Sequence, residues 1–570
     1  MPVSVELVVN GKAVTVDVED DASLLVVLRE QLGVMSVKDG CAPQGQCGCC
    51  TVLVDGSPRV ACVTPAARVT GRSVTTVEGL EPELRSEIVD ELVANGGSQC
   101  GFCTPGILMR AAALRSKGRE EKIDLDRALA AHLCRCTGWQ TIYDSLGRSR
   151  HVSGPIRASN VPRTLGGERA ELETGVAQQV GPSVPIGEAG FADDLAPRDA
   201  LVAVPCPPGS TATTVDAAGL SWVIGESLMD ARNQAGKVQG RRTTMPSSAP
   251  IPLLRLPEGG VRITTGWVEP GYLEPDASWC MPGGTPASPL ANGGAFGGKT
   301  ESLAPLAARE LADRYGRTVR VLYSREDVVR LGPKRPPISA SAVLSGETVE
   351  IRGTSAGDMP VPPSAYALTL NAEWDRVFLR GPPVSASLRA VGLAEHSLLV
   401  EGALNAGNAD RSSLVLPGVA NVLLDTAVVN QHGARAGARV EIDPATGSIT
   451  RIFVRVAAGD PLDEVVMRSY AVGAAHMALG WVLTESIAVD IESGEVHDLT
   501  IRSLGIIRPA RVPPIEVEIV DDPGEPLARS SDAVFAAVAS AAWNSLTIAE
   551  GARPETLPAR DTRCAYTLRA

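Results

Sequence analysis

The sequence is poor in histidine and has no surplus of positive charge. Only six of its 570 residues are histidine, and they are scattered, so any metal site would be mostly sulfur. The formal net charge of −13 argues against a nucleic-acid partner, because phosphate binding needs a basic face. We find no apolar run of membrane-span length and no secretory signal in residues 1–7. We therefore expect no membrane span and a cytoplasmic location.

Cysteine is the informative residue. Nine of the 12 cysteines fall before residue 137, and such clustering in an unsecreted protein favours metal binding over disulfides. The length of the chain predicts three or four domains.

The first residues predict a small β-rich domain. Val5, Leu7 and Val9 alternate with polar residues up to Asn10-Gly11, and valines alternate again on the return, which indicates a hairpin. A helix is expected at about residues 23–31. The Gly-rich stretch that follows contains four cysteines, and a fifth comes 12 residues later.

Four thiolates close in space can hold a 2Fe–2S cluster, and glycines let backbone N–H groups point at the cluster sulfurs. The predicted ligands of a first cluster are Cys41, Cys47, Cys50 and Cys62. Cys49 is expected to be a small buried filler. A zinc site, or unligated buried cysteines, is the alternative, although the loop lacks the paired short knuckles typical of structural zinc.

A helical domain is expected next, with helices near residues 84–94, 105–116, 124–133 and 139–146. Two cysteine pairs lie at the predicted helix ends, where helix N-termini stabilise thiolates. The predicted ligands of a second cluster are Cys100, Cys103, Cys134 and Cys136. Zinc is again the alternative.

These motifs resemble the paired 2Fe–2S motifs of the xanthine dehydrogenase/aldehyde oxidase family of molybdenum hydroxylases. The resemblance covers residues 1–146 and implies an α/β multidomain protein: a β-grasp ferredoxin-like domain (1–78), then a four-helix 2Fe–2S domain (79–150). A linker (151–190) would lead to a large mixed α/β molybdopterin-binding region in two parts (191–345 and 346–570). Gln99 matches the family glutamine that hydrogen-bonds the pterin of the molybdenum cofactor.

A Gly-rich segment in the second half, residues 292–299, resembles the family loop that passes over the molybdenum. Four glycines in six residues also permit close approach of a ligand, although a generic tight loop is the alternative. The expected cofactor-binding residues are Gly294, Ala295, Phe296, Gly297 and Gly298. The family often has glutamate after the lysine, whereas this chain has Thr300 and then Glu301.

Two further residues match the catalytic groups of the family. Arg389 resembles the arginine that holds the substrate, with a surface arginine as the alternative. Glu525, in a Gly-Glu-Pro turn between a predicted strand (513–520) and a predicted helix (531–543), falls on the general base. A carboxylate can deprotonate a molybdenum-bound hydroxyl, which then attacks an electron-poor carbon. A solvated turn glutamate is the alternative.

The chain also departs from the family. Its second half is shorter, with much of the first subdomain missing between residues 222 and 283. The Gly-Gln-Gly and serine-rich segments that grip the pterin are not found between residues 405 and 431. His476 and Met477 stand near the place of a cofactor-contacting glutamine. No segment resembles the flavin domain, so FAD is expected on a partner chain.

The resemblance implies a molybdenum hydroxylase that oxidises an N-heterocycle or an aldehyde, with water as the oxygen source. Electrons would pass through the two 2Fe–2S clusters to a separate flavin-binding subunit, within an oligomer. The alternative is a non-catalytic iron–sulfur electron-transfer or assembly subunit of such a complex.

Overall fold

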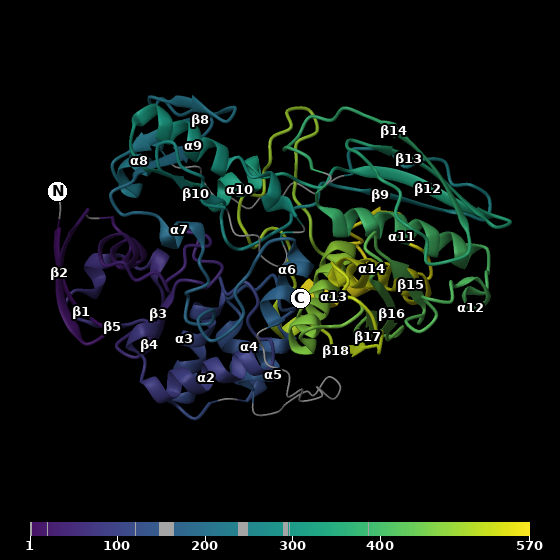
Figure 1. The fold of residues 1–570 in the computed structure, drawn as a ribbon, viewed down its shortest axis with the longest axis horizontal. Coiled ribbons are helices and arrows are strands. Elements are labelled where there is room, and N and C mark those ends of the chain that lie inside the picture. Colours follow the sequence, from purple (N-terminus) through teal and green to yellow (C-terminus); the bar gives the residue numbers. More distant parts are fainter. Residues whose placement is uncertain are drawn as a thin grey trace.

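The computed structural model describes residues 3–19, 21–119, 121–147, 165–236, 249–288, 295, 297–385 and 387–569. Figure 1 shows the two N-terminal domains on one side of the molecule and the large C-terminal sheets and helices on the other. Two of the expected cofactor-binding residues, Gly294 and Phe296, lie outside the described residues, as does much of the predicted linker.

The N-terminal domain is built on the predicted hairpin. β1 (Val3–Val9) pairs antiparallel with β2 (Lys12–Val18) across Asn10-Gly11, and Val5, Leu7 and Val9 are buried as their alternation predicts. The sheet order is β2-β1-β5-β3-β4, with β3 Thr51–Val54, β4 Ser57–Val60 and β5 Ser73–Thr75. The expected helix is present as α1 (Leu24–Val26), continued by a π-helical turn over Val27–Gln31.

The second domain contains the four expected helices. They are α2 (Pro82–Ala94), α3 (Thr104–Arg115), α4 (Lys122–Leu129) and α5 (Gln140–Leu146). Trp139, immediately before α5, is fully buried with Leu92 and Leu108. Nearly every residue of α3 is buried, because other parts of the chain cover it.

A third unit holds a five-stranded sheet of order β10-β11-β6-β8-β7. Its strands are β6 Leu201–Pro205, β7 Val215–Ala217, β8 Leu220–Gly225, β10 Ala277–Cys280 and β11 Val319–Leu322. The accompanying helices are α7 Ala192–Leu195, α8 Leu228–Ala235, α9 Ala304–Tyr315 and α10 Arg325–Leu331. A short 3-10 helix, Gly298–Glu301, precedes α9.

A third sheet has the order β14-β13-β12-β9-β19. Its strands are β9 Val261–Thr265, β12 Ile338–Ser345, β13 Thr348–Ser355, β14 Thr369–Arg376 and β19 Thr556–Leu557. The predicted boundary at residues 345/346 falls in the β12–β13 turn, where Ser345 pairs with Thr348. The two predicted C-terminal regions therefore share one sheet.

The fourth sheet, of order β15-β16-β17-β18, forms the C-terminal core with three long helices. Its strands are β15 Thr426–Val429, β16 Arg435–Ile442, β17 Ile449–Ala457 and β18 Ile515–Ile519. The long helices are α11 Arg389–Ala406, α13 Glu464–Leu483 and α14 Ser530–Glu550; α12 Arg411–Leu414 and α15 Arg563–Arg569 are short.

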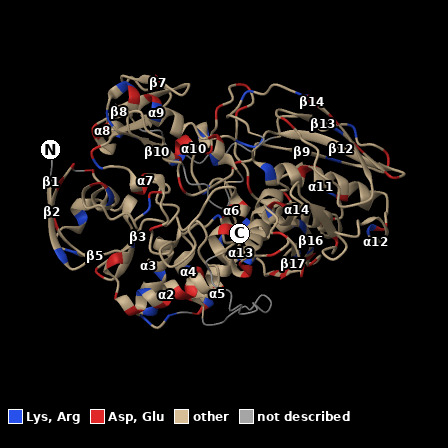
Figure 2. Cartoon of the chain, viewed as in Figure 1, with Lys and Arg blue, Asp and Glu red and all other residues tan. Residues whose placement is uncertain are grey.

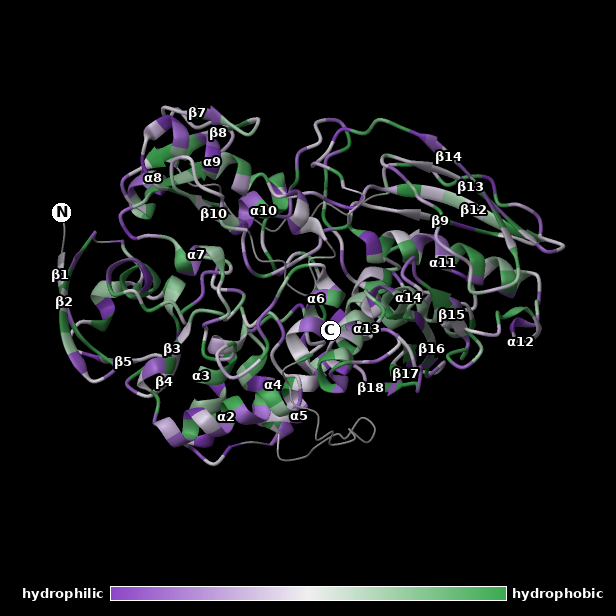
Figure 3. Cartoon of the chain, viewed as in Figure 1, coloured by the Kyte–Doolittle hydropathy of each residue, from purple (hydrophilic) through white to green (hydrophobic). Residues whose placement is uncertain are grey.

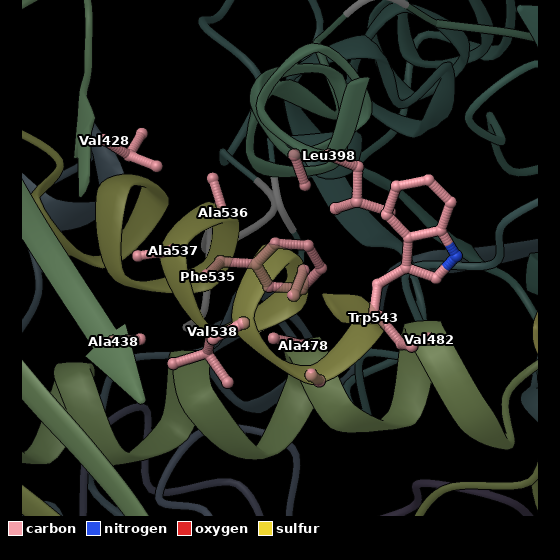
Figure 4. Close-up of a cluster of buried hydrophobic side chains, with 14 of the residues drawn as sticks. Leu398, Val428, Ala438, Ala478, Val482, Phe535, Ala536, Ala537, Val538 and Trp543 are labelled. Atoms are coloured by element: carbon pink, nitrogen blue, oxygen red, sulfur yellow. The ribbon is translucent and has the colours of Figure 1, made fainter. Parts of the chain in front are cut away.

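Helix α14 is hydrophobic on most of its surface because it packs against both α11 and α13 (Figure 3). Figure 4 shows Phe535 and Trp543 of α14 among Leu398, Ala478 and Val482 of those helices. Contrary to the expectation from the sequence, α14 has the length and hydropathy of a membrane span. Of its apolar window, 78% is buried inside the molecule, as in a core helix.

Candidate functional site

The first cysteine site is formed by the loop before β3 and the turn after β4. Cys41, Cys47, Cys50 and Cys62 are all buried. The Cys41 Sγ accepts the backbone N–H groups of Gln46 and Cys47, each at 3.3 Å, and the Cys50 Sγ accepts that of Cys62 at 3.4 Å. These amide contacts stabilise negative charge on sulfur, as an anionic cluster requires.

Gly48 allows this loop to pack against the helical domain. Its φ is +75°, and a Cβ there would lie 2.5 Å from the imidazole ring of His132. The His132 Nε2 lies 3.2 Å from the Thr51 hydroxyl, and burial lowers the pKa of His132 to about 3, so the ring is neutral. Cys49 is buried beside the site, with its Sγ 3.9 Å from the Cys47 carbonyl.

The second cysteine site brings together two thiol pairs from separate loops. The Sγ atoms of Cys100 and Cys136 are 3.4 Å apart, and Cys103 and Cys134 also contact through their thiols. The hydrogen bond with Cys103 lowers the pKa of Cys134 to about 7, and the Thr137 hydroxyl lies 3.1 Å from its Sγ. Within the described ranges, no group of three or more His, Cys, Asp or Glu side chains is arranged to hold a single metal ion. Two pairs suit two irons, each with two thiolates.

Replacing Cys103 with serine is expected to remove one of two paramagnetic signals of the reduced protein, because the two sites lie in separate domains. Native protein should contain about four irons per chain, since two four-thiolate sites hold two irons each. Cys49→Ser is the matched control, and it should keep both signals. Stoichiometric zinc without acid-labile sulfide in the native chain would contradict both cluster assignments.

The second half of the chain covers both cysteine sites. The Arg325 guanidinium donates to the carbonyl of Gly40 at 3.1 Å and to two carbonyls of its own half, Tyr272 and Leu273. Near the second site, Arg135 makes a two-fold contact with Glu485, at 2.6 and 2.7 Å. Each arginine is at most 2% exposed, so these contacts are closed to solvent.

Gln99 connects the second cysteine site to α13. Its Nε2 donates to the Cys136 carbonyl and to the Ser469 hydroxyl, both at 2.9 Å. Its Oε1 is buried and has no partner among the described residues. A buried acceptor without a donor is costly, so this atom has the chemistry to receive an N–H group of a bound pterin.

The structure brings the Gly-rich segment next to Arg389. Gly297 has φ +89°, and a Cβ there would lie 2.2 Å from the Ser387 carbonyl and 2.9 Å from an Arg389 nitrogen. Ala295 and Gly298 are buried beside it. The backbone of the Gly-rich segment therefore packs closely against the backbone that precedes α11, as expected for a tight glycine loop.

Arg389 is the first residue of α11, and its guanidinium is already engaged by the protein. Its Nε lies 2.8 Å from the Asp532 carboxylate of α14, and an Nη donates to the Glu173 carbonyl at 3.0 Å. Burial is the largest influence on Asp532 and raises the pKa of that carboxyl. These contacts use Nε and one Nη, so a ligand at Arg389 would bind the other Nη, on the side of Gly297, or displace one of the two contacts.

Glu525 lies in an exposed turn. The turn is held through its backbone: the Gly524 carbonyl accepts the N–H of Asp460 at 3.0 Å, and Leu527 donates to Ala458 at 2.8 Å. No hydrogen bond or ion pair joins the Glu525 carboxylate to Arg389 in the described part of the chain. The structure thus brings Arg389 next to Gly297, whereas no hydrogen bond or ion pair joins the Glu525 carboxylate to either of them among the described residues.

The sequence did not predict the helix within the linker, α6 (Gly166–Thr174). Arg169 and Glu173 of this helix form an ion pair at 2.5 Å in which both side chains are 0% exposed. Glu173 also accepts the Ser530 hydroxyl at 2.5 Å and the Ser531 N–H at 2.9 Å, which caps α14. The i,i+4 spacing of Arg169 and Glu173 was the available signal for a helix.

Two family models match the N-terminal part of the chain. Residues 7–68 match the 2Fe-2S iron-sulfur cluster binding domain, and residues 76–146 match the [2Fe-2S] binding domain. The xanthine dehydrogenase iron-sulfur-binding subunit of Escherichia coli O157:H7 is 39% identical over 148 residues, which are 25% of this chain and 92% of that protein. The aldehyde oxidoreductase of Megalodesulfovibrio gigas is 40% identical over 145 residues, 25% of this chain and 16% of that protein.

The fold of the whole chain is also shared with a solved structure. The aldehyde oxidoreductase from Desulfovibrio gigas aligns with a TM-score of 0.71 and 15% identity, covering 100% of both chains. The chain belongs to the xanthine dehydrogenase/aldehyde oxidase family of molybdenum hydroxylases, enzymes that carry 2Fe–2S clusters and a molybdenum-molybdopterin cofactor. Residues 7–68 and 76–146 match the two cluster-binding domain models, and the whole chain has the fold of an aldehyde oxidoreductase.

Proposed function

We propose that this chain oxidises an N-heterocycle, such as a purine-like ring, or an aldehyde, with water as the source of oxygen. The main support for the proposal is the side chain of Gln99. Its Nε2 donates to the Cys136 carbonyl at the second cysteine site, and its buried Oε1 has no hydrogen-bond donor among the described residues. A pterin bound there would lie within direct reach of the second cluster. Electrons would then pass from the second cluster to the first.

The molybdenum cofactor, when bound, supplies an activated oxygen and takes two electrons from the substrate. The chain's own residues would bind and orient the reactants. Gln99 would hold the pterin, and the backbone of Ala295, Gly297 and Gly298, with Gly294 and Phe296, would lie against the metal. Arg389 would orient the substrate, and Glu525 would accept a proton from the attacking oxygen.

The linker helix α6 limits how a substrate can bind Arg389. Arg389 donates to the Glu173 carbonyl and pairs with Asp532, so a substrate must bind the remaining Nη or displace one of these two groups. The exposed position of Glu525 adds a second condition, because a general base must come within hydrogen-bond reach of its proton. Turnover requires that both conditions be met; a chain that met neither would act as the alternative, a non-catalytic iron–sulfur electron-transfer or assembly subunit.

Metal analysis of protein from a host that makes the cofactor separates the two functions. Iron, sulfide, molybdenum and pterin should be measured on the same preparation. Molybdenum and pterin at about one per chain, with turnover of a heterocycle or aldehyde, would support the hydroxylase. Four irons without molybdenum would support the electron-transfer subunit.

A flavin-binding partner subunit is part of the proposal, within an oligomeric, cytoplasmic complex. The chain alone is expected to reduce artificial one-electron dyes faster than NAD. Clusters carry single electrons, whereas hydride transfer to a nicotinamide needs a flavin or its equivalent. The measurement compares initial rates with both acceptors on flavin-free protein. Fast NAD reduction by that preparation would contradict the need for a partner.

A further inference from the structure

A cavity of about 460 Å³ lies where the two cysteine domains meet the second half of the chain. Cys62 and Pro43 line it from the first cysteine site, and Phe102, between Cys100 and Cys103, lines it from the second. Phe191 and Tyr323 complete its aromatic walls. The volume falls within the range of about 300–1,000 Å³ that small-molecule sites occupy. The chemistry proposed above does not use this cavity.

The cavity is negatively charged. Eight carboxylates and three guanidinium groups line it, and each arginine is held by an acidic neighbour. From outside the lining, Lys38, Lys299 and Arg330 pair with Asp194, Glu274 and Asp327. Arg29 pairs with Asp193 and Asp194, Arg320 pairs with Glu30 and Asp193, and Arg232 lies 3.5 Å from Asp39. Figure 2 shows acidic residues on both α7 and α10, which flank the cavity. Two carboxylates of the lining, Asp21 and Glu326, have no ion-pair partner among the described residues, and this remaining negative charge favours a cationic ligand.

Glu274 gives the cavity a buried polar group that lacks a donor. It lines the cavity and is 1% exposed. One of its carboxylate oxygens contacts the Lys299 ammonium, whereas its Oε1 has no partner among the described residues. Burial is the main reason that the pKa of Glu274 is raised to about 7. A ligand that brings a positive charge or an N–H donor would stabilise this carboxylate.

The aromatic walls favour a flat ligand. Phe102 and Phe191 meet edge to face, with centroids 5.2 Å apart and an interplanar angle of 86°. The Lys38 ammonium lies 5.3 Å from the Phe191 centroid, so this ring already faces one cation. Planar rings pack well against such walls, and a cationic ring gains further attraction from the aromatic faces.

We propose that this cavity binds a planar, positively charged aromatic electron carrier of the phenazinium class, next to the Cys62 ligand of the first cluster. In each exchange, one reduced cluster loses one electron and the bound carrier gains it, with no bond made or broken. The electron exchange rests on the clusters of the proposed function. Binding of the carrier does not depend on the clusters, and it can be measured on fully oxidised protein.

The binding test uses the full chain with its clusters oxidised, titrated with N-methylphenazinium in a calorimeter. Met229→Trp fills the cavity without changing its charge, because Met229 lines it. Met281→Trp is the matched control, since Met281 is 54% exposed and does not line the cavity. We expect saturable binding that Met229→Trp weakens at least about tenfold, or about 1.4 kcal/mol. Met281→Trp should leave the affinity unchanged.

A charge variant tests the role of the carboxylate. Glu274→Gln should weaken binding of the cation about tenfold and binding of neutral phenazine less than about threefold, because the substitution removes only the charge. If this variant does not fold, the Met229→Trp result decides alone. Equal affinity in native protein and Met229→Trp, or no saturation with the cation in native protein, would overturn the site.

Reoxidation of dithionite-reduced protein tests the electron exchange. A rate that saturates with N-methylphenazinium concentration, and that Met229→Trp slows, would support transfer within the cavity. A rate that rises linearly and equally in both proteins would overturn it. Binding to a preparation without paramagnetic cluster signals would retain the site and assign the failure to the proposed clusters.

Discussion

Replacing Glu173 with alanine is expected to lower the free energy of unfolding by about 3–5 kcal/mol, because it leaves the Arg169 guanidinium buried without its partner. Arg169 and Glu173 are both 0% exposed, so water cannot replace the lost charge. The change also removes the group that receives the Ser530 hydroxyl and the Ser531 N–H at the start of α14. The measurement is the denaturant midpoint of the cluster-loaded chain.

Two variants make this result specific to the buried pair. Glu171→Ala changes an exposed glutamate of the same helix and should shift the midpoint little. The double variant Arg169→Leu/Glu173→Leu should recover much of the lost stability, because replacing both charges removes the desolvation cost. Equal midpoints for Glu171→Ala and Glu173→Ala would show that α6 contributes no buried charge pair.

Replacing Glu525 with glutamine is expected to reduce molybdenum-dependent turnover by about 100- to 10,000-fold, because glutamine keeps the side-chain shape and cannot accept a proton. Both clusters and any molybdenum should remain, since Glu525 is exposed and its turn is held by backbone hydrogen bonds. The measurement is turnover with heterocycles and aldehydes, alongside metal content.

Glu518→Gln is the control for this change, since Glu518 is an exposed glutamate of the preceding strand paired with Arg455. Arg389→Lys is the companion test: lysine keeps the charge and loses the planar fork, so a smaller loss than for Glu525→Gln is expected. A loss of less than about tenfold in Glu525→Gln would remove Glu525 from the catalytic role.

Local spacing explains why the cluster domains could be predicted. The hairpin around Asn10-Gly11 and the spacing of the eight cysteines depend on residues close in sequence. The matches to two 2Fe–2S domain families confirm that the chain has two such domains. All eight predicted ligand cysteines are buried in the structure.

Long-range contacts explain why the second half could not be predicted as well. The partners of Arg389 come from α6 and α14, which are far from it in sequence. The i,i+4 spacing of Arg169 and Glu173 favours a helix, but no local pattern shows that this ion pair is buried. The pairing of β12 with β13 across the predicted boundary at residues 345/346 also depends on the sheet that both strands join. The assignments of Arg389, Glu525 and the Gly-rich segment stay predictions.

The arginine contacts that cover the cysteine sites restrict the order of biogenesis. Arg325 and Arg135 connect the second half to the loops around Gly40 and Cys134, and all eight predicted ligand cysteines are buried. An assembly scaffold that delivers iron and sulfide must reach those thiols directly. We therefore expect cluster insertion to precede the closing of the second half over the first, and a chain that closes early to lack iron.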